Sequence, residues 1–470
     1  MKAQQQAAST GATTEEVARS LHAAHREAIY SALMTGLTDP FMIPYALALG
    51  ASSLQAGLLS SARNLLLAAV QLLSSEAVSF FGSRKRLVLV TASLQALLWL
   101  PIALLGLLPR DWAVAGLIVL YTVGTASAAL GGPAWGSLMA EYLAADERGK
   151  YFGHRARASG FWTTVASAIA GGVLQFAPSR VAGFAVLTLG AAASRLASYR
   201  WLSQFHETPW HEAPHLRFTF WAFIRQLRRS NFARFSVSLG AYNLATHLAS
   251  PYFAVYMLEE LHFSYASYTA VILAGSVTGF MTSRWWGAVG DEYGNRAVLR
   301  WTVIGASVLP VLWLVADHPL WFVLLNVTGA FLWSGLALSS VNFLYDACSP
   351  PKRHTCLAYF NVVNGVGISL GAFLGGVIAT WVPLIDRSGY ATVFCVSALL
   401  RAVAGVAFRS FVREVREARH IGLREVVLDF FGQTLEQVLG FFSVKPEVEL
   451  GGRRRRFGRR RRRKAHPPAA

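Results

Sequence analysis

Long apolar stretches recur along this chain and are separated by short polar segments. A helix rises about 1.5 Å per residue, so about 20 residues cross the bilayer core. The pattern therefore predicts an all-α polytopic membrane protein with twelve transmembrane helices. The predicted spans are 29–51, 54–80, 87–109, 112–140, 152–176 and 180–204, followed by 235–258, 264–286, 297–316, 320–345, 356–381 and 388–410.

The polar intervals divide the chain into regions. Two six-helix bundles, 29–204 and 235–410, are expected on either side of a cytoplasmic central loop, 205–234. A cytoplasmic segment, 1–28, precedes them, and Thr13 and Thr14 ahead of Glu15 and Glu16 indicate a helix cap. After the second bundle we expect a cytoplasmic amphipathic helix over 411–442 and a basic, disordered tail over 443–470.

Composition supports the membrane interpretation. The chain has 470 residues, of which 54% are apolar and 14% charged, whereas soluble proteins carry about 25% charged residues. The net charge is +18, and ten of the basic residues lie in 453–464. Such a run beside a membrane predicts contact with anionic lipid rather than nucleic acid. The three cysteines form no CxxC pair, so no disulfide scaffold is implied, and without a phosphate-binding loop no ATP-driven motor is expected. His206, His211 and His215 lie in a proline-containing loop without a ligand pattern, so we expect no metal site, and no cofactor is expected.

Basic residues set the expected orientation. They concentrate in the even-numbered connections and the tail, whereas the odd-numbered connections hold only Arg110, Arg180 and Arg387. Cytoplasmic loops carry the excess of Lys and Arg. Both termini are therefore expected in the cytoplasm, and the protein is expected to be a multi-pass component of the inner membrane.

Internal repetition relates the two bundles. Landmarks in the first half recur in the second at offsets of 205 to 212 residues, which predicts two parallel, pseudo-symmetric halves. The matched landmarks are Glu141 with Asp346, Arg148 with Arg353, Pro44 with Pro251, and Gly82 with Gly294.

The connection after the eighth span carries a motif. It reads Gly287-x-x-x-Asp291-x-x-Gly294-x-Arg296 and resembles the signature loop of the major facilitator superfamily. The segment 140–155 resembles the companion loop of that family. The resemblance implies a two-bundle fold, alternating access and a cytoplasmic gate, with a solvated turn as the plainer alternative. The implied gate residues are Gly287, Asp291, Gly294, Arg296, Glu141, Arg148, Asp346 and Arg353.

The first-half copy of this motif departs from the pattern. Ser79 stands where Asp291 stands in the second half, and Glu76, one turn earlier, is the candidate substitute. Glu76, Arg195 and Arg401 lie toward cytoplasmic span ends, where long side chains reach the interface. We interpret these three as anchors or gate partners rather than solute ligands.

Charges at bilayer depth are costly and are usually paired or functional. Asp39 in the first span and Arg63 in the second are expected to differ in depth by only about 5 Å. They form either a structural ion pair or a site that exchanges a proton or holds an anionic group. Pro40, Pro44 and Pro251 interrupt the first and seventh spans, which points to a transport site. Further candidates are Asn243, His247 and, because the resemblance implies a cavity lined by the tenth span, Asn326.

A glycine repeat in the eleventh span admits two interpretations. Gly367-x-Ser369-x-Gly371 matches the nucleophile elbow of serine hydrolases, but the strand that this motif requires is missing. Together with Gly375, the glycines recur every four residues, which favours close helix packing.

These features predict a non-enzymatic, gradient-driven transporter. It would move a small solute by alternating access, with proton coupling open and a monomer expected. Export of drugs or metabolites by proton antiport is the alternative within transport. A membrane-anchored scaffold or sensor acting through the basic tail is the alternative of another class.

Overall fold

The computed structural model describes residues 13–143, 147–207, 230–348, 353–385 and 389–411, and within these ranges every regular element is helical. The expected amphipathic helix and basic tail, and most of the central loop, lie outside the described residues. The first-half elements are α2 Thr14–Thr38, η1 Asp39–Phe41, α3 Met42–Ala48, α4 Ser53–Gln71, α5 Ser74–Phe81, α6 Arg84–Leu104, η2 Leu105–Leu107, α7 Arg110–Tyr142, α8 Arg148–Phe176 and α9 Arg180–Leu202.

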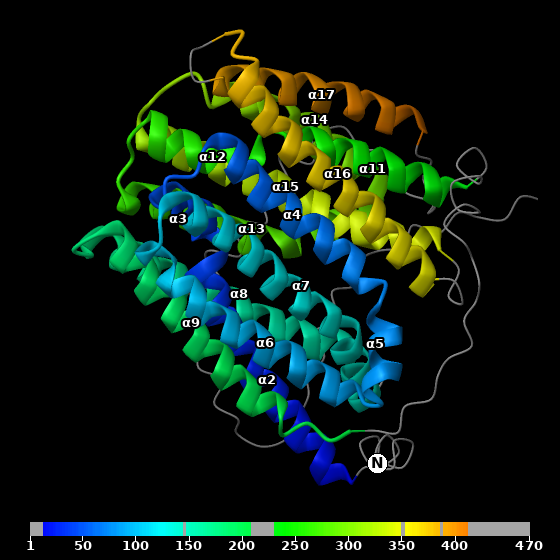
Figure 1. Cartoon of the computed structure of the whole chain (residues 1–470). Coiled ribbons are helices and arrows are strands. Elements are labelled where there is room, and N and C mark those ends of the chain that lie inside the picture. The colour runs from blue at the N-terminus through cyan, green and yellow to red at the C-terminus, as the bar shows by residue number, and fades with distance from the viewer. Residues whose placement is uncertain (1–12, 144–146, 208–229, 349–352, 386–388, 412–470) are drawn as a thin grey trace, which may run out of the picture. The chain divides into compact units, whose positions relative to one another are not determined.

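The second half repeats this order (Figure 1). Within the described ranges the helices follow the twelve predicted spans one after another, and the spans that contain the prolines are broken into shorter pieces. The second-half elements are α11 Asn231–His247, α12 Ser250–Val255, the π-helical turn η3 Tyr256–Glu260, α13 Tyr265–Tyr293, α14 Asn295–Leu312, α15 Pro319–Ala347, α16 Arg353–Trp381 and α17 Tyr390–Phe411.

Not every predicted span is uniformly apolar. Six described helices are long and apolar enough to cross a membrane, and a seventh is gained when α4 and α5, bent by 60°, count as one span. Of the other predicted spans, the first and seventh are broken at their prolines, and the fifth carries Arg155, which lines a cavity described below. Polar side chains inside a bundle lower the mean hydropathy of a helix without exposing charge to lipid.

The first helix begins earlier than the first predicted span. Thr13 and Glu16 form a capping box, so α2 starts at Thr14 and continues without interruption into the bundle. The Thr13 backbone N–H donates to the Glu16 carboxylate at 2.8 Å, and this bond holds the pKa of that carboxyl below its usual value. Much of the expected separate segment 1–28 is therefore part of the first bundle.

The first and seventh spans are interrupted at equivalent places. The α-helical hydrogen bonding of α2 stops at Thr38, and Pro40 lies in the 3-10 turn that follows. In the second half α11 ends at His247, and Pro251 lies in the first turn of α12. Pro44 falls in the first turn of α3, where a proline costs no backbone hydrogen bond.

The glycine repeat of α16 packs directly on α11. A Cβ added to Gly367, Gly371 or Gly375 would lie 2.3, 2.2 or 2.1 Å from the carbonyl oxygens of Gly240, Leu244 and Leu248, respectively. Such distances leave no room for a side chain. The close-packing interpretation of the repeat is thus confirmed, and the hydrolase interpretation is wrong.

Substituting one of these glycines should weaken the second half. Gly371→Ala forces a methyl group against a backbone carbonyl, so we expect a cost of about 1–3 kcal/mol and a lower melting temperature of the purified protein. Gly172→Ala is the matched control, because nothing lies within 4 Å of the Cβ that it adds to helix α8. Equal melting temperatures for the two variants would contradict the packing argument.

The cores of the two halves merge at one end only. One apolar cluster, around Tyr45 and Phe184 of the first half and Tyr252 and Phe394 of the second, draws on both halves. Two other clusters, one around Leu138 and one around Phe235, each draw on a single half. Across the halves α4 packs on α16 and α8 packs on α13 (Figure 1). The shared core therefore lies at the end that the orientation rule places outside the cell, whereas the contact between α4 and α16 runs the length of α4, from Leu54 beside Gly376 to Gln71 beside Asn361.

Candidate transport site

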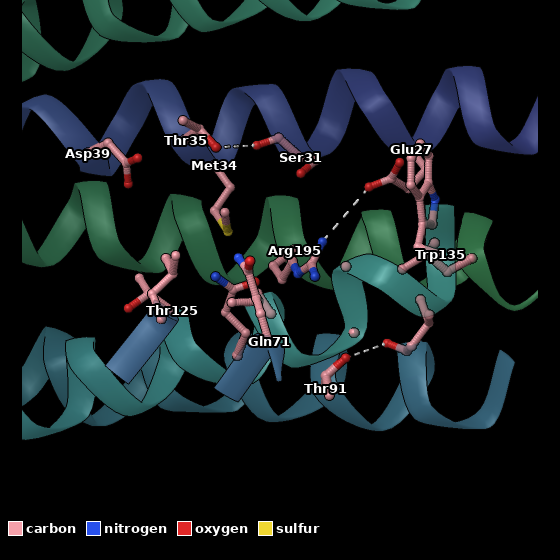
Figure 2. Close-up of a pocket in the computed structure, with 18 of the residues that line it drawn as sticks. Glu27, Ser31, Met34, Thr35, Asp39, Gln71, Thr91, Thr125, Trp135 and Arg195 are labelled. Carbon is pink, nitrogen blue, oxygen red and sulfur yellow. Dashed lines mark hydrogen bonds and ion pairs between the residues drawn. The ribbon is translucent and has the colours of Figure 1, made fainter. Parts of the chain in front are cut away.

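The first half encloses a cavity of about 420 Å³ (Figure 2). Helices α2, α4, α6, α7, α8 and α9 all contribute to its wall. Much of the wall is polar, because hydroxyl, amide, carboxylate and guanidinium groups from different spans meet there. The lining includes Glu27, Ser31, Thr35, Asp39, Arg63, Gln71, Thr91, Gln95, Thr125, Trp135, Arg155 and Arg195.

One face of the first span supplies a polar stripe. Glu27, Ser31, Thr35 and Asp39 recur every four residues, so they lie along one side of the helix. All four line the cavity, and Figure 2 shows them in a row. A separation of twelve residues corresponds to about 18 Å. The stripe thus places one carboxylate toward each end of the cavity.

Asp39 belongs to a cluster of three side chains. An Nη of Arg63 lies 3.5 Å from its carboxylate, and the Tyr121 hydroxyl donates to the other carboxylate oxygen at 3.2 Å. The Arg63 guanidinium also lies 5.5 Å from the centre of the Tyr121 ring. The predicted neighbours Asp39 and Arg63 are therefore together in the structure. Sequence reasoning missed Tyr121, although it lies in the fourth span, which the family resemblance assigns to the cavity wall.

A second charged cluster lies at the opposite end of the stripe. Glu27 is only 5% exposed, and its carboxylate lies 2.6 Å from Arg155 and 3.9 Å from Arg195. The Ser198 hydroxyl donates to Glu27 at 3.4 Å, and the Arg155 guanidinium lies 4.3 Å from the centre of the Trp135 ring. The interpretation of Arg195 as an interfacial anchor is wrong, because this side chain is 8% exposed and lines the cavity.

The second half has its own cavity of about 450 Å³. Its lining includes the predicted candidates His247 and Asn326, together with Arg401 and the aromatic residues Phe253, Trp313 and Trp333. His247 Nδ1 lies 3.0 Å from the Asn243 carbonyl oxygen, one turn earlier in α11. The Asn243 side chain instead donates to Asn364 of α16 at 2.6 Å, away from the cavity lining.

Arg401 is also buried rather than interfacial. It is 2% exposed, and its three donor groups bond to the Ser397 hydroxyl and to the carbonyl oxygens of Ala306 and Thr246, each at 3.1 Å. Thr246 is the penultimate residue of α11, so the guanidinium satisfies a carbonyl at the break of the seventh span. The interpretation of Arg401 as an anchor is therefore wrong.

The signature-like loop forms a tight turn between α13 and α14. Gly294 has φ 85°, a conformation that favours glycine, and Asn295 behind it is 2% exposed and donates to Asp346 at 3.3 Å. Asp291 is exposed at the end of α13. The Arg353 side chain lies outside the described residues, so its expected contact with Asp291 stays a prediction. A Cβ added to Gly287 would meet its nearest neighbour, Leu338, at 3.6 Å, an ordinary contact distance.

The first half forms a comparable contact between its third and fourth spans. Arg84, 2% exposed at the start of α6, binds Glu141 through two bonds of 2.6 and 3.0 Å and donates to Ser137 at 2.7 Å. Arg148 bonds to the carbonyl oxygens of Ala140 and Leu143 at the end of α7. Glu76, the candidate substitute for the missing motif aspartate, is exposed on α5.

These contacts join span beginnings to span ends in both halves, as an internal duplication requires. The sequence model of the Major Facilitator Superfamily matches residues 28–281 and 231–459. The chain belongs to the major facilitator superfamily. It is therefore a secondary transporter, and its helices cross a membrane.

Solved structures of other superfamily members share the fold. A point mutant of the nucleoside transporter NupG has a TM-score of 0.66 at 12% identity, and the match covers 83% of this chain and 100% of that protein. A D-xylose–proton symporter has a TM-score of 0.65 at 12% identity, with 86% and 99% covered. A bacterial homologue of the iron transporter ferroportin, in an inward-facing state, has a TM-score of 0.63 at 12% identity, with 85% and 99% covered. No curated protein sequence matches this chain.

The superfamily repeat also relates residues of the two cavities. Arg195 of α9 and Arg401 of α17 are 206 residues apart, and Tyr121 of α7 and Asn326 of α15 are 205 apart. Both offsets fall within the range of the sequence landmarks. The equivalent arginines nevertheless have different partners, since Arg401 bonds to backbone carbonyls and Arg195 faces Glu27. Among the described residues, no group of three or more His, Cys, Asp or Glu is placed to hold a metal ion.

Proposed function

We propose that this transporter couples the movement of a small solute to protons, and that Asp39 is the proton-exchanging group. The observation that carries the proposal is the cluster of Asp39, Arg63 and Tyr121, in which the first, second and fourth spans meet at a cavity wall. In this proposal the protein works as a monomer in the inner membrane, with both termini in the cytoplasm.

The chemistry of the cluster suits coupling. The Asp39 and Arg63 side chains are 42% and 28% exposed, so both remain accessible from the cavity. Protonation of Asp39 removes the charge with which Arg63 pairs and frees the guanidinium for another partner. One proton thereby changes the contact between two spans, which a coupling site needs.

The packing of the halves supports an inward-facing state. The shared apolar cluster closes the end assigned to the outside, where the Tyr268 hydroxyl also donates to the Pro40 carbonyl at 2.6 Å. At the opposite end each half has a core of its own. In this proposal the two cavities belong to one pathway that is open to the cytoplasm, and rocking of the halves exposes it to the outside.

A proton-flux assay tests the coupling. Proteoliposomes loaded with a pH-sensitive dye are challenged with a panel of solutes, and a solute-driven pH change identifies a coupled substrate. Asp39→Asn should abolish the pH change while solute exchange without a gradient continues, because the proton site is lost and the solute site is not. Asp111→Asn, an exposed carboxylate at the start of α7, is the matched control.

The outcomes separate the alternatives. Protons entering with the solute indicate symport, and protons leaving against it indicate the antiport expected of an exporter. A wild-type pH change in Asp39→Asn would contradict the assignment of Asp39. Deletion of 443–470 should leave the flux intact, whereas a scaffold acting through the basic tail would lose its function.

A further inference from the structure

The charges that line the two cavities do not balance. In the first-half cavity, the arginines Arg63, Arg155 and Arg195 face two carboxylates, Asp39 and Glu27, which leaves one positive charge in excess. The described lining of the second-half cavity contains Arg401 and no carboxylate. A buried cation without a counter-charge is costly, so both cavities favour an occupant with negative charge.

Arg195 has bonding capacity to spare, as does Arg63, whose buried Nε likewise has no hydrogen-bond partner among the described residues but whose Nη lies beside Asp39. The Nη1 of Arg195 donates to Ser198 at 3.1 Å and lies 3.9 Å from Glu27, too far for a hydrogen bond. The buried Nε of Arg195 has no hydrogen-bond partner among the described residues. Glu27 is held by Arg155 at 2.6 Å, so its charge is directed mainly at that arginine.

The equivalent arginine of the second half shows the contrast. Arg401 donates through each of its three nitrogens, Nε, Nη1 and Nη2, all at 3.1 Å, and one of these bonds goes to Thr246 at the break of the seventh span. Arg401 therefore stabilises the backbone of the second half. Arg195, at the equivalent position of the first half, still has N–H donors available at the cavity wall.

We propose that the transported solute carries an anionic group, a carboxylate, phosphate or sulfonate, and that Arg195 binds this group in the first-half cavity. A guanidinium offers paired N–H donors that match the oxygens of such groups. The cavity of about 420 Å³ is of the size that holds a small metabolite. Ser31, Thr35 and Gln95 on the same wall supply hydroxyl and amide groups for the rest of the molecule.

This inference rests on the proposed transport function, but its test needs no gradient. The melting temperature of the purified full-length protein in detergent is measured with sodium succinate, inorganic phosphate or sodium methanesulfonate, at constant ionic strength kept with sodium chloride. Succinamide is the neutral analogue of succinate. At least one anion should stabilise the wild type in a saturable manner, and succinamide should not.

Two substitutions of Arg195 test whether this residue binds the anion. Arg195→Gln should weaken the binding of that anion by about tenfold or more, the effect of losing charged hydrogen bonds. Arg195→Lys, which keeps the charge and loses the planar fork, should bind with intermediate affinity and serves as the test if the Gln variant does not fold. Arg180→Gln is the control, because Arg180 is exposed at the start of the same helix.

The results decide between this inference and the coupling proposal. Equal stabilisation of wild type, Arg195→Gln and Arg180→Gln would show a general salt effect and overturn the inference. The absence of stabilisation by all three anions, or equal stabilisation by succinamide, would also overturn it. Arg195-dependent anion binding together with an unaltered pH change in Asp39→Asn would refute the coupling proposal alone.

Discussion

A disulfide between α4 and α16 is expected to stop transport completely, and its reduction is expected to restore transport. In the double variant Leu54→Cys, Gly376→Cys, the two cysteines lie on different halves. A Cβ built on Gly376 lies 3.1 Å from the Leu54 Cα, so two cysteine Cβ atoms can reach the separation of about 3.5–4.5 Å that a disulfide requires. The bond would hold together the end at which the halves share an apolar core, and alternating access requires that end to part.

The measurement is solute-driven proton flux in proteoliposomes, before and after oxidation and again after thiol reduction. The native cysteines Cys348, Cys356 and Cys395 could also be oxidised, so they are replaced by alanine in all variants. The control pair is Leu98→Cys, Gly124→Cys, for which the Cβ of Gly124 would lie 3.8 Å from the Leu98 Cβ within the first half. A bond there joins α6 to α7 and should leave the flux unchanged. Full flux through the oxidised Leu54–Gly376 variant would refute rocking of the halves at this contact.

The order of the spans could be predicted because apolar length and positive loop charge are local properties. The same holds for the helix breaks near Pro40 and Pro251, since proline lacks the backbone N–H wherever it stands. The contact between Asp39 and Arg63 could be predicted from their expected depth in the bilayer, because adjacent antiparallel spans bring residues of similar depth together. The structure adds Tyr121, whose contact depends on the packing of a third span.

The cluster of Glu27, Arg155 and Arg195 could not be predicted from span order and depth. The sequence indicates a cytoplasmic loop charge for Arg155 and a place in the cytoplasmic N-terminal segment for Glu27, yet α2 and α8 carry both into the first bundle. Arg195 and Arg401 occupy equivalent positions near span ends, and only tertiary contacts reveal that both are buried. One available signal was the fourfold spacing of Glu27, Ser31, Thr35 and Asp39, which predicts a polar face along the first helix.

Neutralising Glu27 is expected to destabilise the protein more than any other single substitution considered for the cavity. Glu27→Gln leaves Arg155 and Arg195 facing each other, both largely buried, without the carboxylate between them. Removing one partner of a buried ion pair costs about 3–5 kcal/mol. The melting temperature of the purified protein should therefore fall, by an amount on the order of 5 °C or more. Glu76→Gln, an exposed carboxylate on α5, should leave it unchanged.

A second substitution shows whether the unbalanced charge causes the loss of stability in Glu27→Gln. Glu27→Gln combined with Arg195→Gln restores the original charge balance of the cluster, so the double variant should regain much of the stability that Glu27→Gln loses. The same reasoning applies to a bound anion: succinate or phosphate should stabilise Glu27→Gln more than the wild type, because it supplies the missing negative charge beside Arg195. A double variant that is less stable than either single variant would show that shape and hydrogen bonding, rather than charge, hold this end of the cavity together.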